Sequence, residues 1–360
     1  MEIHVLDGLQ GDVNIIDTFQ SVVWNMQFFD VSDFELIVPG TAKNFRILKK
    51  GVMLVRSVDI VVDPENPANV TYKNVMRIEK RKLTFDIEDG WILTVGGPGL
   101  KKITGQRIVW SQTNLSGTAE DAIRQVITDN IISPADPART IPNFTLAPRK
   151  GYTEQIEAQL FSENIAEWIK DTCELYGYGW DVYISNGKYV FDLVKGTDRS
   201  YDQSAVTPVV FSREYDNLIS AGYEETAEDT FNAALIGGEG EGTDQITESI
   251  GTATGLDRTE GYIDASGVSS NGEIITLATY KQMLITYGDS EMVKKQDKEQ
   301  ISGEINHEKP YKLNEDYFLG DIVQLQNDFY DAKSRITELI YSEDESGSII
   351  LPTFGAWTDE

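Results

Sequence analysis

The chain has 360 residues, of which 40% are hydrophobic and 25% charged, a composition typical of globular proteins. At this length we expect two or three domains, because one hydrophobic core seldom organises so long a chain. No apolar run approaches the roughly 18 residues of a membrane-spanning helix, and Met1–Asp7 has neither the basic start nor the apolar stretch of a signal peptide. We therefore expect synthesis in the cytoplasm, with export only inside an assembly.

Negative charge is concentrated in the second part of the chain, and the formal net charge is −28. Residues 1–150 carry 18 acidic and 17 basic side chains, whereas residues 151–360 carry 41 acidic and 14 basic ones. A strongly acidic surface repels nucleic-acid phosphates and anionic membranes. The charge thus argues against a nucleic-acid-binding module, and it fits either a well-solvated surface or a wall along which DNA passes without binding.

Residues 1–97 are predicted to form short β-strands that recur roughly every ten residues. Apolar residues alternate with polar ones in these runs, which are Ile3/Val5, Val22/Trp24/Met26/Phe28, Phe34/Leu36/Val38 and Met53/Val55. A hairpin is predicted at Asp89-Gly90, between alternating runs at 83–87 and 91–95, because Asp-Gly favours a type I′ turn. This pattern is typical of a small barrel or sandwich.

Two amphipathic helices and a second hairpin are predicted next. Thr118–Asp121 has the pattern of a capping box and precedes an apolar stripe at Ile123, Val126, Ile127 and Ile131. A second stripe covers Ile165, Trp168, Ile169, Thr172, Cys173 and Tyr176, with Ser162 as the expected N-cap. Four prolines between 133 and 148 predict an extended connector. Asn186-Gly187 predicts the turn of a hairpin between 180–184 and 189–193.

From about Val206 the chain is predicted to return to strands, at 209–211, 218–220, 233–236, 317–326, 335–341 and 348–352. The last two are expected to pair across the acidic turn 343–347. Residues 237–256 read as a long, mobile Gly/Thr/Glu loop. The mixed-charge segment 291–299 reads as the solvated face of a helix near 276–300, interrupted by Gly288.

The sequence offers few residues for catalysis or metal binding. The two histidines, His4 and His307, belong to no metal-binding or triad motif, and the single Cys173 fits a small core residue. Acidic loops at 224–229 and 343–345 lack the ligand spacing of a calcium loop. We therefore expect no cofactor, no metal site and no catalytic residue.

Carboxylates leave one enzymatic alternative open. Glycoside hydrolysis needs only two acids in a cleft. Because the second part of the chain holds so many acids, the presence of an acid pair in the sequence neither supports nor excludes this activity. The aromatic run 176–180 fits either sugar stacking or core plus turn. An acid-pair glycoside hydrolase and a non-catalytic carbohydrate-binding module remain the alternative functions.

Two neighbouring segments, 231–242 and 255–265, hold the most distinctive motifs. Gly237–Gly242 superficially resembles a phosphate-binding turn, but Glu239 and Glu241 stand where the anion would bind and no lysine follows. A flexible acidic loop after an apolar strand is the better interpretation. In the second segment Asp257, Glu260 and Asp264 are spaced acids, and Arg258 beside them favours a salt bridge over a metal site.

These two segments resemble the tail-tip hub proteins of long-tailed (siphovirus) phages. Further matches follow in the same order along the chain. They are Trp24 with 30–36 and Pro39, Gly96–Lys102 with Arg107, and Tyr311–Val323. The turn 63–67 departs from the pattern as a small insertion, and no appended domain is expected after residue 360.

The resemblance implies a mainly β fold, with two tube-like β-barrel or sandwich domains flanking a helix-helix-hairpin region. We expect a first β domain at 1–112, an α+β insert at 113–204, and a second β domain at 205–360 with a helix near 276–300. The motif residues expected to serve structure or assembly are Trp24, Phe34, Leu36, Gly237, Gly238, Gly240, Gly242, Leu256, Asp257, Arg258, Tyr262, Asp264, Gly320 and Asp321.

The same resemblance implies a structural, non-enzymatic virion protein at the tail tip. Three copies would form a hub (baseplate) ring that caps or continues the tail tube, with barrel edges pairing between subunits. Its expected partners are further copies of itself, the distal tail protein, the tape-measure protein, and receptor-binding or fibre proteins. Residues 238–255 would become ordered on assembly. A prophage or a tail-like bacteriocin is an equally suitable source.

Overall fold

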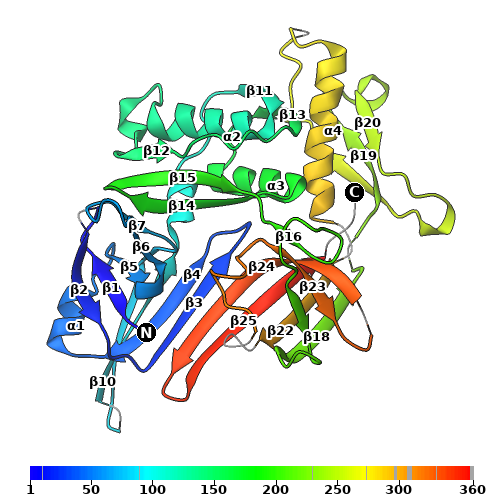
Figure 1. Ribbon diagram of the computed structural model, residues 1–360. Helices are drawn as coiled ribbons and strands as arrows, with labels where there is room; N and C mark the ends of the chain where they lie inside the picture. The colour runs from blue at the N-terminus through cyan, green and yellow to red at the C-terminus, as the bar shows by residue number, and fades with distance from the viewer. Residues whose placement is uncertain are drawn as a thin grey trace.

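The computed structural model describes residues 1–356 apart from positions 10, 89, 229, 273, 296–297, 306–309 and 330. His307 and Asp89 of the expected Asp89-Gly90 turn therefore lie outside the described residues. The chain is mainly β, with an α+β part between its first and last strands (Figure 1).

One large antiparallel sheet connects the two ends of the chain. Its strands follow the order β18-β22-β25-β24-β3-β4-β10-β9. Their bounds are β3 (Ser21–Gln27), β4 (Asp33–Pro39), β9 (Lys80–Asp86), β10 (Gly90–Pro98), β18 (Leu218–Thr226), β22 (Lys298–Ile305), β24 (Asp331–Asp344) and β25 (Gly347–Ala356). The blue strands β3 and β4 lie beside the red strands β24 and β25 in Figure 1, because β3 pairs with the second half of β24.

Smaller groups of strands turn this sheet into two open sandwiches. The N-terminal group runs in the order β2-β1-β5-β8, with β1 (Ile3–Leu6), β2 (Asp12–Ile16), β5 (Met53–Arg56) and β8 (Met76–Arg77). A short helix, α1 (Ala42–Ile47), follows β4. In the C-terminal half, the first part of β24 pairs with β23 (Ile322–Gln326), which carries β16 (Asp198–Arg199) and β17 (Val210–Ser212) on its other side.

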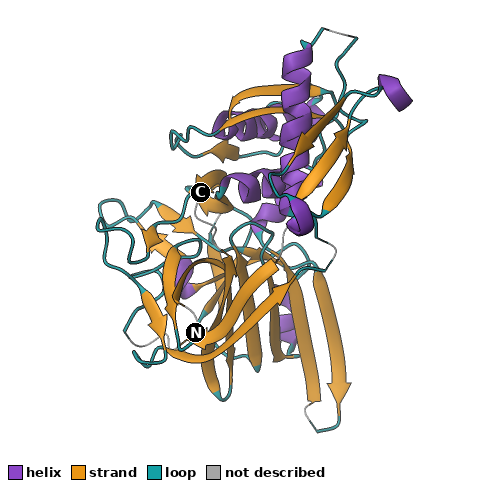
Figure 2. Cartoon of the chain, turned by 90° about the vertical axis from the view of Figure 1, so that its right-hand side faces the viewer, coloured by secondary structure: helices purple, strands orange, loops and turns teal. Residues whose placement is uncertain are grey.

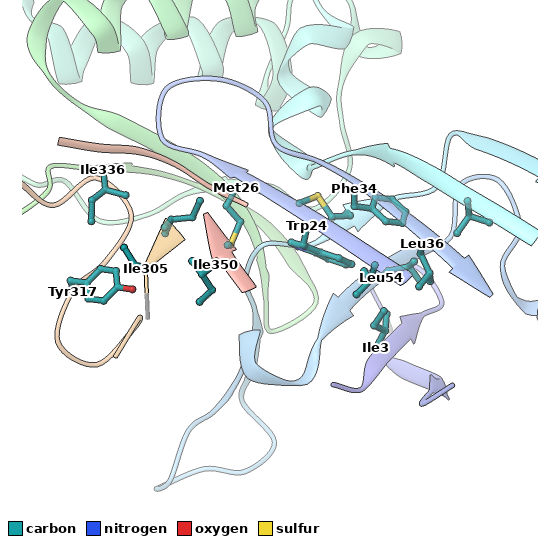
Figure 3. Packing of buried hydrophobic residues seen from close by; sticks show 14 of the residues in the cluster. Ile3, Trp24, Met26, Phe34, Leu36, Leu54, Ile305, Tyr317, Ile336 and Ile350 are labelled. Atoms are coloured by element: carbon teal, nitrogen blue, oxygen red, sulfur yellow. The ribbon is translucent and has the colours of Figure 1, made fainter. Parts of the chain in front are cut away.

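A single hydrophobic core runs through both sandwiches. In strand β3 the residues Val22, Trp24 and Met26 are buried and alternate with partly exposed ones, which is the period of a strand with one face on a core. Figure 3 shows Met26 between two groups of core side chains. One group is N-terminal and the other C-terminal: Ile3, Trp24, Phe34, Leu36 and Leu54, and Ile305, Tyr317, Ile336 and Ile350.

The insert forms a second core above this sheet. It contains α2 (Ala119–Ile127), α3 (Ile165–Tyr176), the pair β11 (Thr113–Thr118) and β13 (Gln155–Leu160), and a sheet ordered β12-β15-β14-β7-β6. The strands of that sheet are β6 (Ile60–Val62), β7 (Val70–Tyr72), β12 (Phe144–Leu146), β14 (Gly179–Ser185) and β15 (Lys188–Val194). Because β6 and β7 come from the first 72 residues, the insert's sheet is completed by the N-terminal part of the chain.

A small α/β unit stands apart from the large sheet. Strands β19 (Ala233–Gly237), β20 (Thr247–Ile250) and β21 (Glu260–Asp264) form a three-stranded sheet that packs against the long helix α4 (Leu277–Val293). In Figure 2 this helix rises along the sheet of the unit, above the sandwiches. The strand predicted at 233–236 thus belongs to this unit rather than to the second sandwich.

Local sequence signals are confirmed in several places. Thr118 caps α2 by accepting a hydrogen bond from the backbone N of Asp121. Asn186 and Gly187, with φ angles of 50° and 72°, make the turn between β14 and β15. Cys173 is fully buried in the second core.

Several predictions are wrong. The cap of α3 is Asn164 and not Ser162, because the Asn164 side chain accepts hydrogen bonds from the N–H groups of residues 166 and 167. The expected loop 237–256 contains β20, which pairs with β19; its ordering on assembly stays a prediction. The mixed-charge segment 291–299 leaves the helix after Val293 and enters strand β22 at Lys298.

The predicted fold class, mainly β with an α+β insert, is confirmed. The described strands form open sandwiches and close no barrel. The domain boundaries stay a prediction, and the pairing of β3 with β24 places strands of the two expected β domains in one sheet.

Gly288 lies inside α4, so its predicted interruption of the helix is also wrong. A Cβ at this position would lie 2.2 Å from Cδ1 of the buried Ile236, so glycine lets α4 approach the sheet of the small unit. Alanine normally stabilises a helix by about 1 kcal/mol relative to glycine. We expect Gly288→Ala instead to lower the free energy of unfolding by about 1–3 kcal/mol, through overpacking. Urea unfolding measures this, and a stabilised variant would contradict the close approach; Gln282→Ala, on the exposed face of α4, is the matched control.

Candidate functional site

The predicted motif residues lie in three separate places and do not converge on one site. Trp24, Phe34 and Leu36 are buried in the sandwich core. Gly320 and Asp321 lie where the insert meets the C-terminal strands. The others belong to the α/β unit: Gly237, Gly238, Gly240, Gly242, Leu256, Asp257, Arg258, Tyr262 and Asp264.

The first two glycines of the acidic loop make room for tyrosines. A Cβ at Gly237 would lie 2.0 Å from the hydroxyl of Tyr262, and one at Gly238 would lie 2.5 Å from the hydroxyl of Tyr280. Gly240 and Gly242 have φ angles of 96° and 60°, which the left-handed region allows glycine at little cost. These glycines therefore serve the packing and turning of the chain.

Glu239 binds within the α/β unit instead of leaving the loop free for an anion. Its carboxylate accepts hydrogen bonds from the Ser269 hydroxyl and the backbone N of Ser270, and these bonds lower the pKa of Glu239. Its backbone N donates to the Tyr280 hydroxyl at 2.7 Å. A carboxylate fixed at the mouth of the glycine turn is incompatible with phosphate binding there.

The second motif segment is held by a salt bridge, as its sequence predicts. Arg258 pairs with Glu260 at 2.7 Å and donates to the carbonyl of Ala253. Asp264 accepts from the backbone N of Ser266, and hydrogen bonds from the side chain and the backbone of Ser266 lower the pKa of Asp264. Asp257 contributes its backbone carbonyl, which accepts from the side chain of Asn232.

Two motif residues of this unit are exposed. Leu256 is fully exposed and the ring of Tyr262 is more than half exposed. Both belong to the segment whose pattern resembles the hub proteins, and neither is needed to close the small core.

Gly320 and Asp321 form the joint between the insert and the C-terminal sandwich. The buried Asp321 carboxylate pairs with Arg199 at 2.6 Å and accepts from the backbone N of Thr197. A Cβ at Gly320 would lie 2.0 Å from the ring of Phe28, and one at Gly179 would lie 2.2 Å from the same ring. Phe28 thus packs between the insert and the C-terminal strands, where only glycines leave it room.

Sequence reasoning missed a buried ammonium at this joint. Lys101 lies in the Gly96–Lys102 motif, at the start of the 3-10 helix Leu100–Gln106. Its Nζ donates to the carbonyls of Gln27, Phe28 and Asp30, and burial lowers its pKa to about 8. The sequence signal for this site was a lysine within the Gly96–Lys102 motif. That signal does not reveal burial, because the burial of Lys101 depends on the turn after β3, which is distant in the sequence.

The α/β unit and the insert enclose a polar cavity of about 190 Å³ between α3, β13 and α4. Lys294 pairs there with Asp171 at 2.8 Å and with Glu291 at 2.7 Å. Burial raises the pKa of Asp171 and of Glu163. Lys294 thus links α4 to α3 through its ion pair with Asp171, in a cavity whose lining holds more carboxylates than lysines.

An open groove of about 950 Å³ lies on the outer side of β4, β9 and β10, toward α3. Its lining mixes lysines and arginine with carboxylates, of which Asp30 pairs with Lys170. Burial raises the pKa of Asp33 in the same groove.

Within the described ranges, no three His, Cys, Asp or Glu side chains come together as a metal site would require. Over those same ranges, no helix combines the length and apolarity needed to cross a bilayer.

Both terminal strands of the large sheet are exposed. On β9 and its turn, the exposed fraction is 61% for Phe85 and 91% for Ile87, and the β9–β10 hairpin projects at the lower edge of Figure 1. On β18, Ile219 and Tyr223 are exposed as well. No described strand pairs with the outer side of either one. These edges are the candidate assembly surface.

Comparison with known proteins places the whole chain in one family. The model described as siphovirus ReqiPepy6 Gp37-like protein matches residues 2–356. No individual curated protein matches the sequence.

The fold is similar to that of three solved tail proteins. The prophage MuSo2 43 kDa tail protein from Shewanella oneidensis has a TM-score of 0.58 at 12% identity, covering 98% of both chains. A tail protein from Neisseria meningitidis MC58 has a TM-score of 0.58 at 13% identity, covering 98% of this chain and 96% of that one. Prophage tail protein gp18 from Listeria monocytogenes EGD-e has a TM-score of 0.54 at 11% identity, covering 100% and 96%.

We expect Asp321→Asn to lower the free energy of unfolding by about 3 kcal/mol, because it leaves Arg199 without its buried partner. Chemical denaturation followed by tryptophan fluorescence measures the change. The same substitution at the exposed Asp328 is the control and should leave stability unchanged. Equal stability of the two variants would show that the joint does not depend on this ion pair.

Asp289 on α4 provides a test of pH dependence. Burial raises the pKa of its carboxyl. Between about pH 3.9 and this raised pKa, the carboxyl is therefore still protonated in the folded state but already ionised in the unfolded state. The wild type should therefore lose stability as pH rises through that window. Asp289→Asn should be the more stable protein at pH 7, with an advantage that disappears toward pH 3.9. Melting curves across pH measure this, and a pH-independent difference would contradict it.

Proposed function

The chain belongs to the family of siphovirus ReqiPepy6 Gp37-like proteins, and from this membership we propose that it is a structural protein of a phage tail that forms the hub at the tail tip. The fold shared with three tail proteins over nearly their whole length supports this role. The role is mechanical rather than catalytic: the hub caps or continues the distal end of the tail tube.

The observation that carries the proposal is the open large sheet. The eight strands of its main path end in β9 on one side and β18 on the other, and both ends expose apolar side chains. A long exposed edge strand invites pairing with another chain, so proteins that remain alone usually shorten, cover or charge it. A sheet that stays open at both ends fits a subunit that is completed by neighbours on two sides.

A closed ring of three copies satisfies both edges. Head-to-tail contacts close into a ring when the rotation between subunits fits, and a closed ring terminates instead of polymerising. Each chain contributes two sandwiches, so three copies would supply six around the ring. The N- and C-terminal sandwiches share the sheet through β3 and β24, which holds their spacing constant.

The remaining surfaces fit attachment and passage of DNA. We assign the exposed Leu256 and Tyr262 of the α/β unit to contacts with other tail components, such as the distal tail, tape-measure and receptor-binding or fibre proteins. The other motif residues support the fold around them. A net charge of −28 keeps DNA from adhering to a channel wall.

We expect the purified protein to have a mass of three chains of 40.3 kDa each, measured by light scattering. Negative-stain images of the same peak should show rings with a central hole. If the chain is a monomer in isolation, it should assemble as rings on tails that lack it. A compact monomer that also fails to bind such tails would contradict the hub assignment.

A further inference from the structure

The two free edges of the large sheet are complementary in direction. All seven pairings along the path from β18 to β9 are antiparallel. With eight alternating strands, the first and the last run in opposite directions. A second copy placed alongside, by continuing the same sheet, therefore brings its β18 antiparallel to β9 of the first copy without any inversion.

The two edges also agree in which face they turn toward a core. Leu83 on β9 lies opposite the buried Leu93, so its side of the strand continues the core face of the N-terminal sandwich. Tyr223 on β18 lies opposite the buried Ile301, so its side continues the core face of the C-terminal sandwich. Since side chains alternate along a strand, pairing that keeps these faces together would bury both side chains.

Charge selects a register. Strand β9 begins with the bases Lys80, Arg81 and Lys82, whereas β18 ends with Glu224 and Glu225 before Thr226. Antiparallel pairing brings the basic start of β9 beside the acidic end of β18. Opposite charges directly across a strand pair stabilise it, and like charges oppose it.

One register satisfies charge and apolar contacts together. Placing Lys82 opposite Glu224 brings Arg81 opposite Glu225. The apolar side chains next to them then also meet on the core side, with Leu83 opposite Tyr223.

We propose that β9 of one copy pairs with β18 of a second copy in this antiparallel register, with Lys82 opposite Glu224. This rests on the proposed ring and names the surface that forms it. The contact is heterologous, since each copy offers a different edge on each side. Lysines on an edge normally deter pairing, and here the acidic edge of the next copy offsets them.

The first experiment exchanges the two charges. Lys82→Glu alone, and Glu224→Lys alone, should each raise the dissociation constant of the assembly at least tenfold by light scattering. The double variant should restore the wild-type value. Lys43→Glu, at a basic position on α1 that is also exposed, is the matched control and should have no effect. Unchanged circular dichroism and melting temperature would show that each variant is folded.

The second experiment traps the contact covalently. Thr84 and Gly222 lie opposite each other in the proposed register, so Thr84→Cys combined with Gly222→Cys should give intermolecular disulfides under mild oxidation. Non-reducing gels should show two-chain and three-chain products. Thr84→Cys combined with Thr226→Cys is out of register and should not cross-link.

The outcomes separate this pairing from the ring itself. Rings without charge rescue and without the in-register cross-link would overturn the edge pairing and leave the hub assignment intact. An in-register cross-link in a protein that never forms rings, alone or on tails, would support the pairing and overturn the ring. Equal cross-linking in both cysteine combinations would point to unspecific contact and would overturn the register.

Discussion

The antiparallel pairing of β3 with β24 is the constraint on which the rest of the molecule depends. It joins residues 21–27 to residues 338–344, from opposite ends of the chain. Without it the two sandwiches would have separate cores and separate sheets. Arg56 strengthens this junction, since its guanidinium lies over the rings of Trp24 and Tyr341 and pairs with the buried Asp59. The pairing thus makes two sandwiches into one body with a single long sheet.

The insert is positioned by a second junction that uses close packing in place of strand pairing. Phe28 follows directly after β3, and the glycines at 179 and 320 leave space for its ring. The guanidinium of Arg335 lies over that ring, and burial lowers the pKa of Arg335 to about 10. Lys101 donates hydrogen bonds to the carbonyls of Gln27 and Phe28 in the same turn. Polar groups are buried here because each one has a partner, which fixes the orientation of the insert on the sheet.

The motif residues of this chain serve packing, turns and ion pairs where the structure describes them. The motif glycines and acids of the α/β unit hold tyrosines, turns and a salt bridge in place. The exposed edges β9 and β18 carry opposite charge at the ends that would meet.

The sequence by itself determined the local elements, and the tertiary structure decided how they combine. Alternation along β3, the capping threonine of α2 and the Asn186-Gly187 turn are set by neighbouring residues, so they could be predicted. The pairing of β3 with β24 spans over three hundred residues, and no local signal selects it among the other apolar strands. From the sequence alone, Gly288 is interpreted as a helix breaker, whereas in the structure it allows Ile236 to pack closely against α4. The burial of Lys101 likewise exists only because carbonyls from residues 27–30 surround its ammonium, since long-range packing alone brings them together.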